Sequence, residues 1–327
     1  MRLVFFGSDA IALPALEYLH WAEGVELAGV ISQPDRPAGR GRHLHTNPVA
    51  AWALAKGIEL LQPDKPGAEE ADWLRAHQAE LALVMAYGHI LRPNVLEAVP
   101  RGMWNLHASP LPAYRGASPV ESAIIAGEKE TGVTLMRMVN KMDAGPIAGM
   151  ETIPILAADT GPVLRARLAQ ACVPLLQRHL RDLGTGAMKT TEQIENLASY
   201  TRKLTKHDAQ VDFAATAAEL ERRVRAFSSW PGVAIEHGGQ AIKIGTATVL
   251  DEATFAPPGG VVRANAAGVD VATGQGVLRL LMLQRPGGRM MDVSEFLRGY
   301  RLAEGEILPS HPMPPLVSRQ PFPKIGQ

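Results

Sequence analysis

Short runs of apolar residues, many of them β-branched, alternate with helical patterns through the first third of the chain. These runs are L-V-F-F from Leu3, V-E-L-A-G-V-I from Val25, I-E-L-L from Ile58, L-A-L-V-M-A from Leu81 and M-W-N-L-H from Met103. Apolar strands that alternate with helices are typical of a mostly parallel sheet with both faces covered. We therefore expect a Rossmann-like α/β domain in this part of the chain.

One helix of this domain carries boundary signals at both ends. Asn47 can cap its N-terminus, and Pro48 suits the first helical position. Gly57 follows Lys56, where a helix commonly ends in a left-handed residue. Together these signals predict a helix over residues 49–56.

The pattern changes after about Val211. A helical pattern over 217–227 is followed by short strand candidates that are separated by glycine-rich turns. These candidates begin at Val233, Ala241, Gly260, Val269 and Val277. Several short strands divided by such turns are typical of a small antiparallel barrel. We expect a second, smaller domain with an OB-like β-barrel fold.

Turn-rich and proline-rich stretches indicate where the domains end. A long helical pattern over 160–183 is followed by G-T-G-A-M-K-T-T, a turn-rich exit from the first domain. The sequence around Asp292 resembles a capping box that opens a last short helix, and the prolines beyond it predict an extended or mobile tail. The predicted divisions are a first domain at 1–187, a linker at 188–208, a second domain at 209–308 and a Pro-rich tail at 309–327.

Composition narrows the class of protein. The chain has 327 residues, of which 46% are hydrophobic, which suffices for two separate cores. Its 33 basic and 33 acidic residues cancel, so any binding to nucleic acid depends on local patches. The single cysteine, Cys172, is expected to be a buried structural thiol. With no signal peptide and no run near the ~20 apolar residues of a membrane span, we expect a cytoplasmic protein without membrane or DNA partners.

Two polar side chains end one of the predicted strands. Asn105 and His107 are two residues apart, so strand alternation sends them to the same side. Ligand crevices in open parallel sheets lie at the carboxyl ends of strands, where this pair is expected. A polar pair in this place can equally well satisfy loop backbone groups. Alone, the pair leaves a functional and a structural interpretation open.

A third polar residue follows a later predicted strand. Asp143 lies in a D-A-G turn, where an aspartate usually caps the turn. Asn, His and Asp together can hold an oxyanion and move protons without a metal ion or a covalent nucleophile. The three residues therefore form a candidate acid–base site.

The segment N-L-H-A-S-P-L-P-A-Y-R-G, with M-D-A-G-P downstream, resembles the signature of the folate-dependent formyltransferases. The resemblance extends from the first strand to about Gly299. It implies a formyl transfer with 10-formyltetrahydrofolate as the co-substrate and without a metal. It also implies that Asn105, His107 and Asp143 are the catalytic residues.

The sequence departs from the usual family pattern at a few positions. Pro110 stands where leucine is usual, Ser8-Asp9 where a Thr-Pro pair is usual, and Ala144 where threonine is frequent. These positions lie beside the three catalytic candidates, all of which are present. The departures concern loop details and rate rather than the class of reaction.

The resemblance also implies where a folate lies. Its pterin is expected beside A-Y-G-H-I-L and the loop that begins near Val139, because a planar heterocycle suits the backbone groups at strand ends. Without the resemblance, A-Y-G-H-I-L is also compatible with a plain strand-to-loop junction. The implied folate-binding residues are Tyr87, Gly88, His89, Ile90, Leu91, Ser109, Val139 and Asn140.

Within that family, two regions resemble the members that formylate initiator methionyl-tRNA for translation initiation. They are Q-P-D-R-P-A-G-R-G-R from Gln33, and F-S-S-W-P-G with V-A-T-G-Q-G-V-L-R-L-L-M-L-Q in the second domain. The arginine loop and the basic linker are the implied tRNA contacts, although such a loop by itself is usually just solvated. The implied residues are Arg36, Arg40, Arg42, Lys203 and Lys206, and Arg222, Arg223 and Arg225 could extend this basic face.

Other functions stay open at this point. The same chemistry could serve a nucleotide-linked amino sugar, glycinamide ribonucleotide or water, although the arginine loop argues against these acceptors. A non-catalytic RNA-binding protein is a second alternative, and the complete Asn, His and Asp set argues against it. His43 and His45 without further ligands are a weak case for a metal site.

Overall fold

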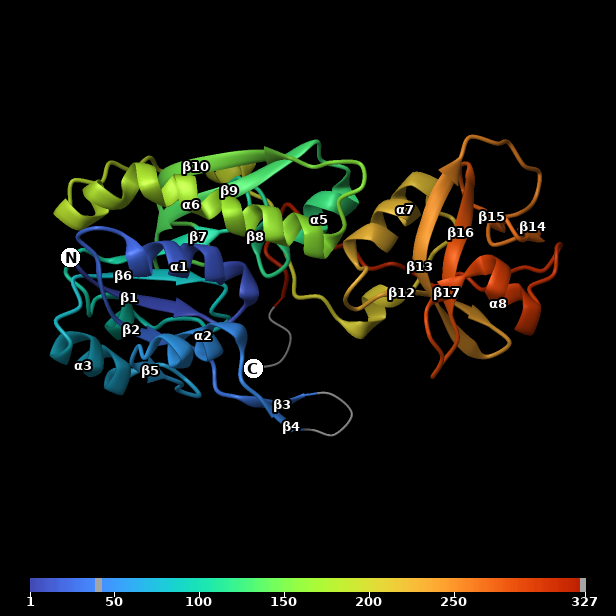
Figure 1. Cartoon of the computed structure of the whole chain (residues 1–327). Helices are drawn as coiled ribbons and strands as arrows, with labels where there is room; N and C mark the ends of the chain where they lie inside the picture. The colour runs from blue at the N-terminus through green and yellow to red at the C-terminus, as the bar shows by residue number, and fades with distance from the viewer. Residues whose placement is uncertain (39–42, 324–327) are drawn as a thin grey trace. The chain divides into compact units, whose positions relative to one another are not determined.

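Figure 1 shows the computed structural model of the chain, which describes residues 1–38 and 43–323. The chain forms two compact units. Unit 1 consists of Met1–Gly116, Glu130–Pro154 and Arg165–Tyr200, and unit 2 consists of Ala117–Lys129, Ile155–Leu164 and Thr201–Gln327. The units interleave along the sequence, and the contiguous divisions expected from the sequence stay a prediction.

Unit 1 is built on a seven-stranded sheet. Its strands run in the order β10 (Ile147–Pro154), β9 (Glu130–Arg137), β7 (Met103–His107), β6 (Leu81–Met85), β1 (Arg2–Gly7), β2 (Glu26–Ile31) and β5 (Leu60–Leu61). The pairs from β7 to β5 are parallel, whereas β9 and β10 are antiparallel. The prediction of a mostly parallel α/β sheet is therefore confirmed.

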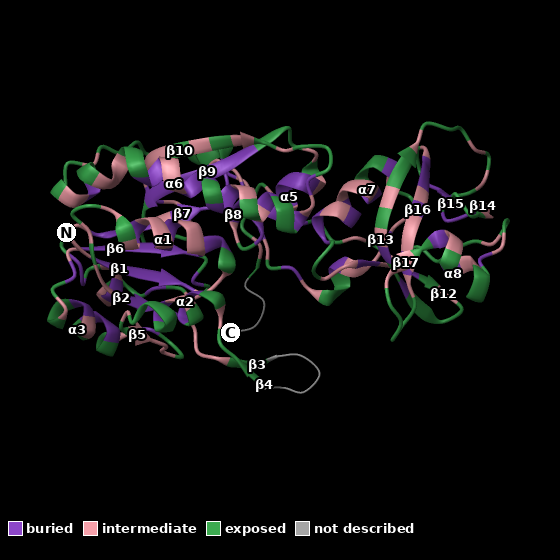
Figure 2. Ribbon diagram, viewed as in Figure 1, coloured by how far each residue is buried: buried purple, intermediate pink, exposed green. Residues whose placement is uncertain are grey.

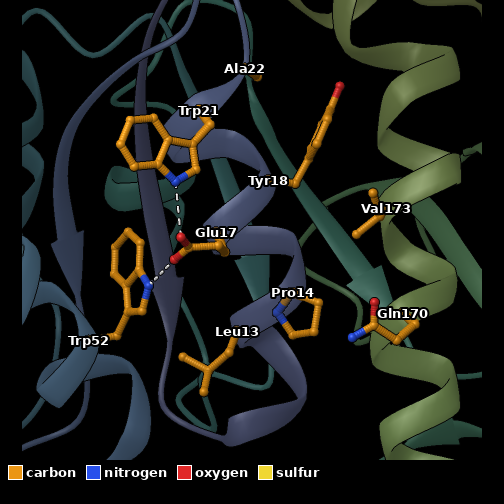
Figure 3. A pocket seen from close by; sticks show the side chains of 9 residues that line it. All are labelled: Leu13, Pro14, Glu17, Tyr18, Trp21, Ala22, Trp52, Gln170 and Val173. Carbon is orange, nitrogen blue, oxygen red and sulfur yellow. Dashed lines mark hydrogen bonds between the residues drawn. The ribbon is translucent and has the colours of Figure 1, made fainter.

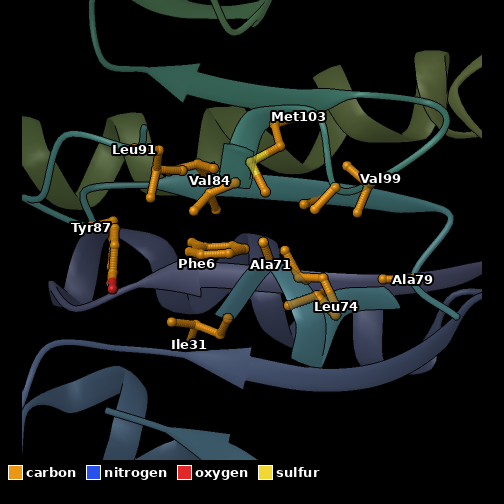
Figure 4. Packing of buried hydrophobic residues seen from close by; sticks show 14 residues of the cluster. Phe6, Ile31, Ala71, Leu74, Ala79, Val84, Tyr87, Leu91, Val99 and Met103 are labelled. Carbon is orange, nitrogen blue, oxygen red and sulfur yellow. The ribbon is translucent and has the colours of Figure 1, made fainter. Parts of the chain in front are cut away.

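Helices cover both faces of this sheet, because its central strands are apolar on both sides. On one face, side chains of β1, β6 and β7 pack against α3 (Ala68–Ala76) and α4 (Pro93–Leu96), as Figure 4 shows. On the other, the Sγ of Cys172 in α6 (Gly161–Thr185) lies 3.7 Å from the Sδ of Met85. Burial raises the pKa of the Cys172 thiol to about 12, so the predicted structural thiol is confirmed.

Further elements of unit 1 connect these layers. The predicted helix forms as α2, with the Oδ1 of Asn47 accepting from the Ala50 N–H at 3.0 Å and Gly57 at φ +67°. Two short hairpin strands precede it, and the sequence patterns did not predict them. The bounds are α1 (Leu13–Trp21), β3 (Arg36–Ala38), β4 (His43–His45), α2 (Pro48–Lys56), β8 (Arg115–Gly116) and β11 (Tyr200–Thr201).

Unit 2 contains an antiparallel sheet. Its order is β12 (Val233–His237), β13 (Gln240–Leu250), β16 (Val277–Gln284), β15 (Gly268–Ala272) and β14 (Val261–Asn265), with β17 (Met291–Asp292) on β16. The antiparallel strands were predicted, but closure into a barrel is not confirmed. Within the described residues β12 and β14 lie at opposite ends of the sheet order. Alternating burial in β13 leaves one face of that strand exposed.

Helices and the C-terminal segment complete unit 2. These helices are α5 (Pro119–Ala126), α7 (Ala217–Ala226) and α8 (Val293–Gly299), and a short strand, β18 (Val317–Ser318), lies in the tail. The Oδ1 of Asp292 caps α8 by accepting from the Ser294 N–H at 2.9 Å, so the predicted last helix is confirmed. The Nε of Arg202 donates to the Pro315 carbonyl at 3.0 Å, which holds the described part of the tail.

Figure 2 shows that the central strands of the unit 1 sheet are its most buried part, whereas the helices have exposed outer faces. Within residues 1–38 and 43–323, the structure contains no helix whose length and apolar character would let it span a bilayer.

Candidate active site

The carboxyl end of β7 brings two of the three catalytic candidates together. The Nδ1 of His107 lies 3.7 Å from the Oδ2 of Asp143, and the two side chains are 8% and 13% exposed. Asp143 comes from the loop between β9 and β10, which folds back toward the end of β7. Two segments that are 36 residues apart by number thus meet at one mostly buried point.

A backbone contact determines how His107 presents its ring. The Nε2 of His107 lies 3.0 Å from the carbonyl oxygen of Tyr114. Because a carbonyl oxygen only accepts, Nε2 must carry a proton. Nδ1 is therefore the nitrogen that faces Asp143: it accepts when the ring is neutral and donates when the ring is protonated.

The backbone of Asp143 is held in an uncommon conformation. Its φ is +50°, in the left-handed region that costs a non-glycine residue roughly 1–2 kcal/mol. The Oδ2 of Asp143 accepts from the Gly116 N–H at 2.8 Å, so the carboxylate is tied to the segment that follows Tyr114. The loop is also tight at its base, where a Cβ on Gly145 would lie 1.8 Å from the Arg137 carbonyl oxygen.

Asn105 lies on the same face of β7 as His107. It is half-buried and stands opposite Met136 of β9. In the part of the chain that the structure describes, its side-chain amide has no hydrogen-bond partner. An amide without a protein partner beside an imidazole and a carboxylate is available to a ligand oxygen.

Residues that the sequence reasoning missed surround this point. The side chain of Gln193 donates to the Asp143 and Gly145 carbonyls, and the fully buried Arg115 donates to Gln193. Glu195 accepts from both Arg115 and Lys141. The R-G pair after the N-L-H signature was the one signal in the sequence that could have pointed to Arg115.

The folate candidates divide into buried and exposed groups. The Tyr87 ring packs against Phe6 in the core, and its carbonyl accepts from Ser8 and Gln33, whereas its buried hydroxyl has no hydrogen-bond partner among the described residues. Leu91 lies in the same apolar cluster, against which Met138 packs. The 86–91 segment and the start of the 138–146 loop thus both contribute side chains to one apolar cluster.

The exposed folate candidates offer an apolar and polar mixture. Ile90 and Val139 are 74% and 41% exposed, and Gly88 and Asn140 are also exposed; Met142, in the same loop as Val139, is 59% exposed. Apolar side chains beside free backbone groups fit a flat heterocycle that carries donors and acceptors.

The remaining two folate candidates are His89 and Ser109. Burial, followed by the nearby Arg36, lowers the pKa of His89, which favours its neutral form. The Ser109 hydroxyl already donates to the Ala113 carbonyl at 2.6 Å, so it serves the loop rather than an open surface.

The candidate tRNA contacts are placed in part. Arg36 is exposed on β3, whereas Arg40 and Arg42 lie outside the described residues. Lys203 and Lys206 are exposed in unit 2. These positions are compatible with phosphate contacts but do not test them.

The expectation that α7 presents a basic face is wrong for Arg223 and is weakened for the neighbouring arginines. Arg223 is 4% exposed and donates to the Asp208 carbonyl. Arg222 donates to the Ile125 carbonyl, and Arg225 bonds with Glu221. The helical spacing turns Arg223 toward the interior of unit 2, where its stem packs and its head group finds buried acceptors.

A hollow of about 550 Å³ lies elsewhere in unit 1, lined by residues of α1, α2 and α6 (Figure 3). Within it, the Glu17 carboxylate accepts from the indole nitrogens of Trp21 and Trp52 and from Lys56. Bonds from Lys56, Trp21 and Trp52 lower the Glu17 pKa to about 2. None of the candidate site residues lines this hollow, and its charged groups satisfy one another.

Two family models match the chain. The model of the formyl transferases matches residues 1–180, and that of the formyl transferase C-terminal domain matches residues 203–301. The chain therefore belongs to the formyl transferase family, and its reaction class is formyl transfer. A methionyl-tRNA formyltransferase of Halorhodospira halophila is 40% identical to it over 305 residues, which are 93% of this chain and 98% of the relative.

Solved structures share the fold at low identity. An N-formyltransferase of Helicobacter canadensis, in complex with folinic acid and dTDP-3-aminofucose, matches with a TM-score of 0.64 and 20% identity over 86% of this chain and 99% of that chain. A methionyl-tRNA formyltransferase of Clostridium thermocellum matches with a TM-score of 0.53 and 12% identity over 77% and 95%. These likenesses establish the fold alone.

Proposed function

We propose that the chain transfers the formyl group of 10-formyltetrahydrofolate to the α-amine of initiator methionyl-tRNA. The products are N-formylmethionyl-tRNA, used in translation initiation, and tetrahydrofolate. The relative at 40% identity supports this acceptor. The single observation that carries the proposal is the approach of the His107 Nδ1 to within 3.7 Å of the Asp143 Oδ2, with the free Asn105 amide on the same face.

The reaction makes one bond and breaks another. A bond forms between the amine nitrogen and the formyl carbon, and the bond from that carbon to the donor nitrogen breaks. One proton leaves the attacking amine and one is gained by the departing nitrogen, so the protons balance. Negative charge gathers on the formyl oxygen between these events, and this charge is what the protein can stabilise.

Asn105 and His107 are the proposed donors to that oxygen. The Asn105 amide has N–H groups that no described residue uses, and the Nδ1 of a protonated His107 points to the same side. The Tyr114 carbonyl holds the ring in place through Nε2. Losing one donor of this kind typically costs on the order of a hundredfold or more in kcat.

Asp143 is the proposed acid–base partner. Its carboxylate stabilises the positive charge on His107 from 3.7 Å, and the Gly116 N–H holds it in position. Through a water molecule, it can take the proton from the amine and return one to the departing nitrogen.

The donor is proposed to bind beside the 86–91 segment and the 138–146 loop. Backbone groups of Gly88 and His89, with the exposed side chains of Ile90, Val139 and Asn140, would bind the pterin. Tyr87 and Leu91 would form the wall behind it, because their side chains are buried in the core.

Transfer assays with single substitutions test the catalytic roles. Asn105→Ala, His107→Ala and Asp143→Ala should each leave a folded protein whose kcat for methionyl-tRNA is lower by roughly a hundredfold or more. An amino-sugar nucleotide, assayed in parallel, should not be formylated by the unaltered chain. Near-normal kcat in two of the three variants would reject the assignment, and efficient formylation of the sugar would reject the acceptor.

The acceptor contacts have a separate test. Arg36, Arg40, Arg42, Lys203 and Lys206 would contact phosphates, so tRNA affinity should fall steeply as salt rises. Replacing Lys203 and Lys206 by alanine should flatten the plot of log affinity against log salt without changing the donor KM. An affinity that stays constant from low to high salt would contradict phosphate contacts.

A further inference from the structure

The loop that carries Asp143 is held from outside by one amide side chain. The Nε2 of Gln193 donates to the Asp143 carbonyl at 2.9 Å and to the Gly145 carbonyl at 2.7 Å. Both bonds act on the main chain, so they place Asp143 without touching its carboxylate. Since the φ of Asp143 is +50°, its backbone needs such support to stay in this conformation.

The orientation of the Gln193 amide follows from its partners. Its Oε1 accepts from the Nη2 of Arg115 at 2.8 Å and from the Nε at 3.1 Å. A guanidinium only donates and a carbonyl only accepts, so rotating the amide by 180° would break four bonds at once. Arg115 thereby directs the two N–H groups of Gln193 toward the loop.

Arg115 is itself fixed in place. It is fully buried, and its Nη1 donates to the Oε2 of Glu195 at 3.0 Å and to the Tyr200 hydroxyl at 3.2 Å. The other oxygen of Glu195 accepts from Lys141, which belongs to the same loop as Asp143. The 193–200 segment therefore holds the loop at three points, namely residues 141, 143 and 145.

The three consecutive residues 114–116 connect this network to the reacting groups. The Tyr114 carbonyl holds His107, the Arg115 guanidinium holds Gln193, and the Gly116 N–H holds the Asp143 carboxylate. A displacement of Gln193 would thus alter the distance between Asp143 and His107 without removing either side chain.

We propose that Gln193 is a positioning residue for formyl transfer. Through its bonds to the Asp143 and Gly145 carbonyls it keeps the Asp143 carboxylate at its distance from His107, and Arg115 fixes the orientation of the Gln193 amide. The proposal rests on the proposed function, because this distance matters only if Asp143 and His107 act together. Gln193 touches no substrate in this scheme.

Two replacements separate positioning from stability. Gln193→Glu keeps the pairing with Arg115 but turns a carboxylate oxygen toward two carbonyl oxygens. The loop therefore loses both hydrogen bonds from residue 193, while the buried Arg115 keeps an acceptor. Gln193→Met is neutral and of similar length, and it removes the N–H groups and the oxygen that accepts from Arg115 without adding charge. Gln170→Glu, on the exposed face of α6, is the matched control.

Both Gln193 variants should lower kcat by roughly tenfold to a hundredfold, because misplacement of about 1 Å near a reacting group has effects of this size. The KM for methionyl-tRNA should stay within about twofold, because Gln193 is not among the acceptor contacts. Amide hydrogen exchange in residues 138–146 should become faster in both variants. The Gln170→Glu control should match the unaltered chain in all three measurements.

Several results would overturn this role. Unchanged exchange in 138–146 would mean that Gln193 does not hold the loop, and faster exchange with normal kcat would mean that the hold does not matter for the reaction. A loss in Gln193→Glu without a loss in Gln193→Met would assign the effect to added charge. Failure of the proposed function is a distinct result, because the unaltered chain would then transfer no formyl group to methionyl-tRNA.

Discussion

The two compact units bury charge in opposite ways. Unit 1 buries a guanidinium, Arg115, whose charged partner Glu195 is 56% exposed and whose other main partner is a neutral amide. Unit 2 buries a carboxylate, Asp208, whose partners Arg202 and Arg223 are only 11% and 4% exposed. The charge in unit 2 is thus compensated in the interior, whereas the charge in unit 1 is compensated at the surface.

The networks around Asp208 and Arg115 also hold different parts of the protein in place. Asp208 accepts from Arg202 and from the backbone and hydroxyl of Thr205, so it fixes the turn between the exposed Lys203 and Lys206. Burial raises the pKa of Asp208, but the bonds from Arg202 and Thr205 outweigh this and leave the pKa below its usual range. The network in unit 1 instead ends on the main chain of one loop. We infer that the Asp208 network serves mainly the fold of unit 2, whereas the Arg115 network serves mainly the reaction.

The largest expected effect is on the stability of unit 2. Asp208→Ala leaves two mostly buried arginines without their carboxylate, and breaking a buried ion pair in this way costs roughly 3–5 kcal/mol. Hydrogen exchange in β13 and β16, followed as urea is raised, measures the free energy of unfolding of this unit. Arg289→Ala, at a surface pair of unit 2 in which the Arg289 side chain is 75% exposed, is the control and should cost less than about 1 kcal/mol. Similar losses of unfolding free energy in the two variants would show that the buried Asp208 network stabilises unit 2 no more than a surface ion pair does.

A second, smaller effect is expected on catalysis in unit 1. Arg115→Lys keeps the charge, but one ammonium cannot reach both Gln193 and Glu195 in the planar geometry of a guanidinium. We expect kcat to fall by about tenfold, which is about 1.4 kcal/mol in activation free energy. Stability should fall less than in Asp208→Ala, because the partners left behind are neutral or exposed. A loss of stability as large as that of Asp208→Ala, with kcat unchanged, would reverse the roles assigned to the two networks.

Sequence patterns predicted what local chemistry determines. Asn47 and Gly57 delimit α2 because a cap and a left-handed terminus each involve residues within one turn. Alternation placed Asn105 and His107 on one side of β7 for a similar reason. In these places the burial pattern and the local propensities agree, so a short window of sequence is sufficient to predict the local structure.

The misses involve long separations or choices made by packing. Arg115 and Gln193 are 78 residues apart, and no local signal in T-E-Q-I-E-N indicates that its glutamine turns toward Asp143. Arg223 was expected on a basic face, yet packing in unit 2 directs it inward. Barrel closure, which stays a prediction, depends on how far the terminal strands curve, and alternation along single strands does not encode this curvature.

The smallest expected effect is a pH dependence at the exposed end of the unit 1 network. Bonds from Lys141 and then Arg115 lower the pKa of Glu195 to about 2, from an ordinary value of 4.5. A carboxyl group whose folded pKa is depressed stabilises the protein fully above its unfolded pKa, and this contribution disappears as pH falls through the folded value. The difference in thermal midpoint between the unaltered chain and Glu195→Gln should therefore be constant above about pH 5 and shrink toward pH 2. In a Lys141→Met background the first cause of the shift is gone, so the difference should be smaller above about pH 5 and should disappear at a higher pH, over a narrower range. A midpoint difference that is independent of pH in both backgrounds would show that the Glu195 charge does not support the loop, and Arg115 would then act through Gln193 alone.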